Sequence, residues 1–236
     1  MEPTLLSLAA DVLRRPLEMV ERVAEQPALL PQVLPRLVLL ALVGGGVFGA
    51  VTGMYRGGPQ VLYAAVKMPL LLLIPPMIVL PAARALVALD GPALSGQRLA
   101  TACLVGMSRT AMLSVALTPP LWLLYRTDLS HQSALAWMLG SLALVGLPGL
   151  ITVVRAMFPA GSPRGSQLAL VALLGLVFAQ TGWLLRPFMS MHGTGYPLLC
   201  AVDHDIFSGL QVRLLSTREA PTDWDCANPL VLGSHR

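Results

Sequence analysis

The chain has 236 residues, of which 55% are hydrophobic and only 12% are charged, with a formal net charge of +4. Soluble domains carry about 25% charged residues, so half that share and a mean hydropathy of +0.70 exclude an ordinary soluble domain. The basic residues are spread along the chain without interleaved aromatic side chains, which argues against a nucleic-acid partner. The composition predicts an all-α integral membrane protein, because a helix pairs its own backbone groups in lipid.

The N-terminal segment, residues 1–35, is predicted to form a cytoplasmic amphipathic helix. Apolar residues recur at spacings of three and four, at Leu6, Ala10, Leu13, Leu17, Val20 and Ala24. Pro16 is expected to bend this helix, and the prolines at 27, 31 and 35 are expected to end it. The segment lacks the basic and apolar pattern of a signal peptide. Two interpretations stay open: a helix lying on the membrane or on the bundle, and a docking element for a partner.

Residues 36–187 are predicted to form a transmembrane domain of about five helices, because each span needs roughly 20 apolar residues. The expected spans are 37–54, 61–80, 99–124, 133–154 and 167–185. In the first span Gly45, Gly49 and Gly53 recur every four residues and form a smooth stripe for close helix packing, within the chain or between copies. The second span contains four prolines that are expected to break or kink it: Pro69, Pro75, Pro76 and Pro81.

Two basic residues, Lys67 and Arg109, lie within spans that contain no acidic residue. Arg109 is about ten residues into the third span, which predicts a place near the middle of the membrane. Lys67 is shallower, and its side chain could extend to the outer interface. Three kinds of partner remain open for these cations: backbone carbonyls freed at prolines, a lipid phosphate or small anion, and a carboxylate of another subunit.

Basic residues in short loops predict a cytoplasmic N-terminus. The N-terminal segment and two of the loops hold most of them, at Arg14, Arg15, Arg22, Arg36, Arg84, Arg98, Arg155 and Arg164. With five spans, the C-terminal tail, residues 188–236, is then extracytoplasmic. Arg56, Arg126 and Arg186 are predicted to form an outer basic rim that binds outer-leaflet phosphates or the acidic residues of the tail.

The tail contains Cys200 and Cys226, 26 residues apart, which we predict to form a disulfide in an oxidising compartment. Closing that loop would stabilise the tail by roughly 3 kcal/mol. No metal site is predicted, because the spacing of Asp203, His204 and Asp205 fits no strong zinc pattern. No catalytic residue and no cofactor is predicted.

Two phrases of the sequence resemble those of a group of uncharacterised bacterial membrane proteins. One is Ala65-Val66-Lys67-Met68-Pro69-Leu70-Leu71-Leu72, and the other ends in Gly182-Trp183-Leu184-Leu185-Arg186-Pro187-Phe188. The resemblance covers roughly residues 36–190, and the five-span layout of the group is similar to that of the Yip family of trafficking proteins. It implies a multi-pass protein of the bacterial inner membrane and no particular activity.

These features favour a non-enzymatic integral membrane subunit or scaffold of a larger complex. Its expected partners are membrane lipids and other membrane-protein subunits, or a second copy of the chain. The alternative is a transporter or channel component for an anion or lipid, because a broken second span and a basic centre fit ligand binding near the midplane. An intramembrane enzyme is disfavoured, since no acid and base pair lies at membrane depth.

Overall fold

A computed structural model describes residues 5–90, 94–127, 129–158 and 162–185. Every regular element in these ranges is a helix: α1 (Leu5–Arg14), α2 (Pro16–Glu25), the 3₁₀ turn η1 (Pro27–Leu29), α3 (Leu30–Gly53), α4 (Gln60–Asp90), α5 (Gly96–Leu124), α6 (His131–Met157) and α7 (Arg164–Leu184). Five of these helices, α3 to α7, are long and apolar enough to cross a membrane, as the sequence predicts. The predicted tail, with Cys200 and Cys226, lies outside the described residues.

The N-terminal segment forms two helices where we expected one bent helix. The backbone leaves the helical conformation at Arg15, and Pro16 occupies the first turn of α2, where its missing N–H would be unpaired in any case. Apolar residues of both helices are buried in the core that they share with α5, at Leu8, Val12, Met19, Val20 and Val23. The segment therefore packs on the bundle, which is one of its two predicted placements.

Prolines interrupt the long helices less than the sequence suggests. The first spanning helix starts at Leu30 and runs through Pro35, at which we had expected the preceding helix to end. Helix α4 likewise remains one helix across all four of its prolines. A proline removes one intrahelical donor, and membrane helices tolerate this loss where a neighbouring helix covers the freed carbonyl. The carbonyl oxygen of Ala65, freed by Pro69, lies beside Gly46 of α3.

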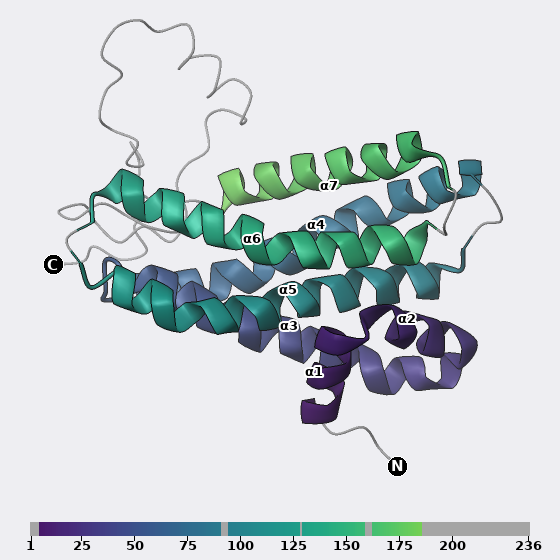
Figure 1. Cartoon of the computed structure of the whole chain (residues 1–236), viewed down its shortest axis with the longest axis horizontal. Coiled ribbons are helices and arrows are strands. Elements are labelled where there is room, and N and C mark those ends of the chain that lie inside the picture. Colours follow the sequence, from purple (N-terminus) through teal and green to yellow (C-terminus); the bar gives the residue numbers. More distant parts are fainter. Residues whose placement is uncertain (1–4, 91–93, 128, 159–161, 186–236) are drawn as a thin grey trace, which may run out of the picture.

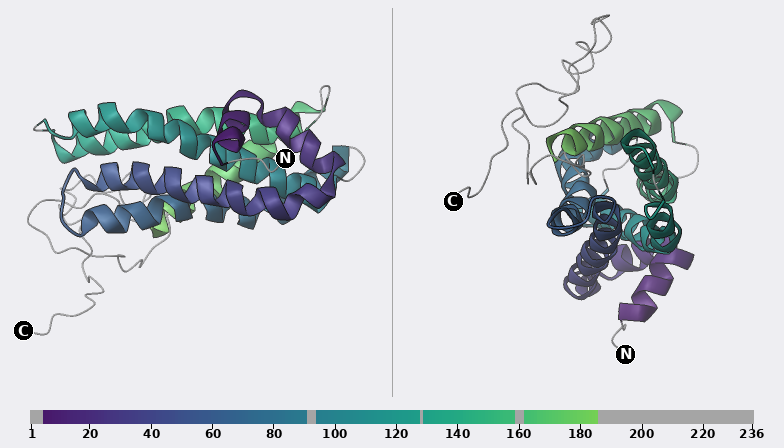
Figure 2. Two further views of the ribbon diagram at one scale, coloured as in Figure 1. Left: turned by 90° about the horizontal axis from the view of Figure 1, so that it is seen from below. Right: turned by 90° about the vertical axis from the view of Figure 1, so that its left-hand side faces the viewer.

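The five long helices lie side by side, and α1 and α2 pack on the outside of their bundle (Figures 1 and 2). Their contacts run in the order α6, α5, α3, α4, α7, and α6 touches α7 only slightly. Helix α5 is the central helix, because it packs against α3, α4, α6 and both N-terminal helices. The N-terminal helices cover α5 and α6 near the ends that carry most of the arginines.

The glycine stripe of α3 packs within the chain, against α4. A Cβ atom added to Gly49 would overlap the carbonyl oxygen of Ala64, and one added to Gly53 would lie 2.6 Å from the carbonyl oxygen of Gln60. At Gly45 the nearest atoms, at 3.2 Å, belong to Leu72 and Pro69 of α4. These glycines therefore allow two backbones to approach each other closely along one face.

Candidate functional site

Arg109 contacts α6 through hydrogen bonds that all leave from Nη1. This atom donates to Oγ1 of Thr152 at 2.8 Å and to the carbonyl oxygen of Pro148 at 3.4 Å. The Thr152 hydroxyl donates to the same Pro148 carbonyl at 2.8 Å. The Arg109 Nε is buried and has no hydrogen-bond partner. The Thr152 hydroxyl and the carbonyl of Pro148 thus satisfy Nη1, whereas Nε remains a buried donor without a partner.

A close crossing of α5 and α6 brings Arg109 to these acceptors. A Cβ atom added to Gly149 would lie 2.5 Å from the carbonyl oxygen of Gly106 and would also overlap the hydroxyl of Thr110. One added to Gly106 would lie 2.9 Å from the carbonyl oxygen of Gly149. Our sequence reasoning missed this crossing, although Gly106 and Thr110 have the small-residue spacing of four that marks such contacts.

Arg109 also lines a cavity of about 270 Å³ between the α1–α2 junction and the two crossing helices. We call it the arginine pocket, and its charged lining residues are Arg14, Arg15, Glu18, Arg109 and Arg155. Pro16, Leu17, Ile151 and Thr152 complete the lining. Four guanidinium groups therefore share the pocket with one carboxylate. None of the residues 1–35 had been predicted to lie beside Arg109.

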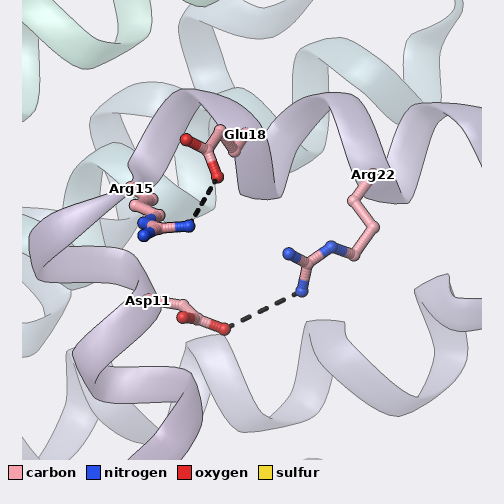
Figure 3. A network of polar contacts seen from close by, with 4 residues as sticks. All are labelled: Asp11, Arg15, Glu18 and Arg22. Atoms are coloured by element: carbon pink, nitrogen blue, oxygen red, sulfur yellow. Dashed lines mark ion pairs between the residues drawn. The ribbon is translucent and has the colours of Figure 1, made fainter.

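The one carboxylate of the pocket already has a partner. Glu18 pairs with Arg15 at 3.5 Å, and the nearby pair of Arg22 and Asp11 joins α2 to α1 at 3.8 Å (Figure 3). Within the described residues Arg14, Arg109 and Arg155 form no ion pair. The pocket therefore holds an excess of positive charge that the described part of the chain does not neutralise.

Lys67 lies in the other half of the bundle. Its side chain is only 2% exposed and is packed inside the bundle, although its shallow position would have let it extend to the outer interface. It shares a helical face with Ala64, Met68 and Leu71, which are all buried. This face of α4 packs against α3, where Ala64 and Met68 contact Gly49, and Lys67 is buried because it lies on the same face.

At the end of the bundle opposite the arginine pocket, a second cavity of about 530 Å³ is lined by aromatic residues and one arginine. The guanidinium of Arg126 lies over the Trp122 ring, 5.2 Å from its centre. The Tyr55 hydroxyl donates to the carbonyl oxygen of Leu129 at 3.2 Å. Arg56 belongs to the turn that follows α3, at this same end, whereas Arg186 lies outside the described residues. Aromatic residues of this kind are typical of membrane interfaces.

No group of three or more His, Cys, Asp or Glu side chains that could hold a metal ion occurs in the described ranges. Cys103 is a buried free cysteine of α5. Comparisons of the chain with protein-family models, with curated proteins and with solved structures found no match. The resemblance to the bacterial five-span group therefore stays a prediction.

Proposed function

We propose that the chain is a non-enzymatic subunit or scaffold of a larger assembly in the bacterial inner membrane. Its two ends support an orientation: eight arginines lie toward the end with the arginine pocket, and Arg56 and Arg126 lie toward the other. Because cytoplasmic loops are enriched in Lys and Arg, the proposed orientation puts the N-terminal helices in the cytoplasm. The bacterial membrane is the one that the resemblance implies.

The observation that carries this proposal is the outward face of α7. Only 17% of the most apolar part of this helix is buried, against 61% for α5. The exposed positions on one side of α7 combine the small residues Ala169, Ala172, Gly175 and Ala179 with two leucines, Leu168 and Leu176. A Cβ atom added to Gly175 would meet nothing within 4 Å. Their spacings of three and four residues put these positions within roughly one third of the helix circumference.

Helix α6 is about twice as buried as α7, with 33% of its most apolar part inside the bundle. Its exposed positions likewise combine large side chains, at Leu144, Leu147 and Ile151, with small ones, at Ala136, Gly140 and Ala143. Small residues let a second helix approach closely and gain van der Waals contact. Because α7 has the least cover within the chain, its small residues between Leu168 and Leu176 fit a transmembrane helix of another subunit.

Blue-native electrophoresis in mild detergent tests the proposal. The wild-type chain should migrate in an assembly, and the double variant Ala172→Leu/Gly175→Leu should migrate as a lone chain of 25.1 kDa. Gly140→Leu on the exposed face of α6, where an added Cβ also meets nothing, is the matched control and should migrate like the wild type. Two differently tagged copies distinguish self-association from a different partner. Wild-type migration as a lone chain would overturn the proposal.

A transporter or channel component for an anion or lipid is the second candidate, and the arginine pocket favours it. It ranks second because the arginine pocket and the aromatic cavity share no lining residue and lie at opposite ends. Flux of an entrapped anion or transfer of a labelled lipid by purified protein in liposomes would promote this candidate above the scaffold.

A further inference from the structure

We propose that the arginine pocket binds a phosphate group, supplied by the headgroup of an anionic lipid or by free phosphate. This inference goes beyond the proposed scaffold function: it uses the orientation proposed above, but it does not require an assembly. Three of the four guanidinium groups in the pocket have no carboxylate partner within the described residues. Guanidinium groups match the oxygens of phosphate with paired hydrogen bonds, and like charges so close together are relieved by an anion.

The residues of the pocket come from four helices, α1, α2, α5 and α6. Arg14 and Arg15 stand at the break between α1 and α2, Arg109 on α5, and Arg155 on the last turn of α6. Arg109 is the innermost of them: Thr152 and Pro148 fix its Nη1, and its Nε remains a buried donor without a partner. Arg14 and Arg155 are exposed and face solvent at the mouth. The pocket thus combines the fixed guanidinium of Arg109 with the exposed guanidinium groups of Arg14 and Arg155, which can adjust to a ligand.

Exposed charged side chains at the mouth of the pocket suit the level of the lipid headgroups. Helix α5 has 29 residues and is roughly 43 Å long, whereas the hydrocarbon is about 30 Å thick. The ion pair beside the pocket is well exposed, with 68% of the Arg15 side chain and 59% of the Glu18 side chain accessible, so it belongs in water or among headgroups. The hydrocarbon must then begin on the far side of this pair. Arg109 is near the middle of α5, and its guanidinium reaches from there to Thr152, near the end of α6 that carries Arg155.

An apolar ridge leads from the pocket into the membrane. Ile151 lines the pocket, and Leu147 and Leu144 follow it at helical spacing along α6, toward the opposite end of the bundle. All three side chains are exposed. The acyl chains of a lipid whose phosphate is bound by Arg109 and Arg155 would lie along this ridge. Basic pockets between helices on the cytoplasmic side are a common form of anionic headgroup site, and the ridge favours the lipid source.

Native mass spectrometry of the full-length protein tests the lipid source, with phosphatidylglycerol and phosphatidylcholine of the same acyl chains as probes. The pocket variant is Arg14→Gln/Arg155→Gln, which changes two exposed side chains. The matched control is Arg84→Gln/Arg164→Gln, which removes the same charge from exposed positions at the same end of the bundle. Wild type and control should each retain one phosphatidylglycerol, and the pocket variant should bind it at least about tenfold more weakly.

Thermal unfolding in phosphatidylcholine nanodiscs tests the free source, with inorganic phosphate as probe and chloride at equal ionic strength as reference. Stabilisation of wild type and control by phosphate, lost in the pocket variant, together with no retained phosphatidylglycerol, assigns the pocket to free phosphate. Equal behaviour of the pocket variant and the control in both experiments would overturn the proposal. The α7 variant Ala172→Leu/Gly175→Leu should retain phosphatidylglycerol like the wild type, so this test can fail independently of the scaffold proposal.

Discussion

Helices α5 and α7 are both apolar enough to cross a membrane, but α5 is the most buried of the five long helices and α7 the least. The apolar part of α5 is 61% buried and that of α7 is 17% buried, although α5 is the less apolar of the two. The difference lies in small and hydroxyl side chains. Helix α5 buries Ser108, which donates to the carbonyl oxygen of Leu37 at 2.8 Å, and Gly106, which touches the backbone of α6. Hydropathy therefore indicates which helices enter the membrane, whereas hydroxyl groups and glycines in contact with neighbouring backbones distinguish α5 as the packed helix.

The sharpest test of this comparison is to enlarge a glycine at a crossing and one on the open face. Gly149→Leu should destabilise the bundle by about 1–3 kcal/mol or more, because the new side chain would overlap the backbone at Gly106. Gly175→Leu, where an added Cβ meets nothing, should change the stability of the single chain by less than about 0.5 kcal/mol. Thermal unfolding in detergent measures both. Equal losses would mean that α7 packs as tightly as α5.

The hydrogen bond between Arg109 and Thr152 offers a second, smaller test. Removing either partner should lower the free energy of unfolding, and a double-mutant cycle with Arg109→Gln and Thr152→Val should give a coupling of about 1 kcal/mol. The control pair is Arg109→Gln with Thr101→Val. Thr101 donates to the carbonyl oxygen of Gln97 within its own helix, at 2.8 Å, and should show no coupling.

Retention of phosphatidylglycerol tests the role of the Arg109 side chain in lipid binding. Arg109→Lys keeps the charge but removes the buried Nε donor and the planar guanidinium. We expect the variant to retain phosphatidylglycerol about threefold to tenfold less well than the wild type, measured by native mass spectrometry. Retention at the wild-type level would show that charge alone suffices and that the oriented donor has no role.

The smallest effect is expected at the ion pair that joins α1 to α2. Arg22 and Asp11 are 3.8 Å apart, with 57% and 47% of their side chains exposed. Such pairs contribute about 0–1 kcal/mol, so Asp11→Asn should shift the unfolding midpoint only slightly. Val12→Ala is the informative contrast, because Val12 is fully buried in the core shared with α5. A larger loss for Asp11→Asn than for Val12→Ala would contradict this account of how the segment is held.

Periodicity and composition predicted the five long helices and the amphipathic character of the N-terminal segment. These features could be predicted because hydropathy reports on the length of a helix and on its environment. The helix ends were harder to predict, since Pro35 and the prolines of α4 suggest breaks but lie inside continuous helices. In a membrane bundle, neighbouring helices compensate the lost donors, and that compensation is a property of the tertiary structure.

The candidate site was half predicted. Arg109 stood out because a cation in an apolar segment is costly. Its acceptors are the Thr152 hydroxyl and the carbonyl of Pro148 itself, whereas we expected a carbonyl freed by a proline, which for Pro148 is that of Leu144. Its neighbours could not be foreseen, because Arg14 and Arg109 are far apart in sequence and meet only when α1 and α2 fold against α5 and α6. The burial of Lys67 was missed for a similar reason: helical position alone did not reveal which face of α4 packs inward.

The short turn between α3 and α4 has a consequence for biogenesis. Gly57 and Gly58 adopt positive φ angles of 78° and 60°, which lets the chain reverse within a few residues. The glycine stripe then brings the backbones of the two helices together from Gly45 to Gly53, the part of α3 next to the turn. Contacts between neighbours in sequence form early. The pair can leave the insertion machinery as a preassembled hairpin, and α7, held mainly by α4, would be the last helix to find its place.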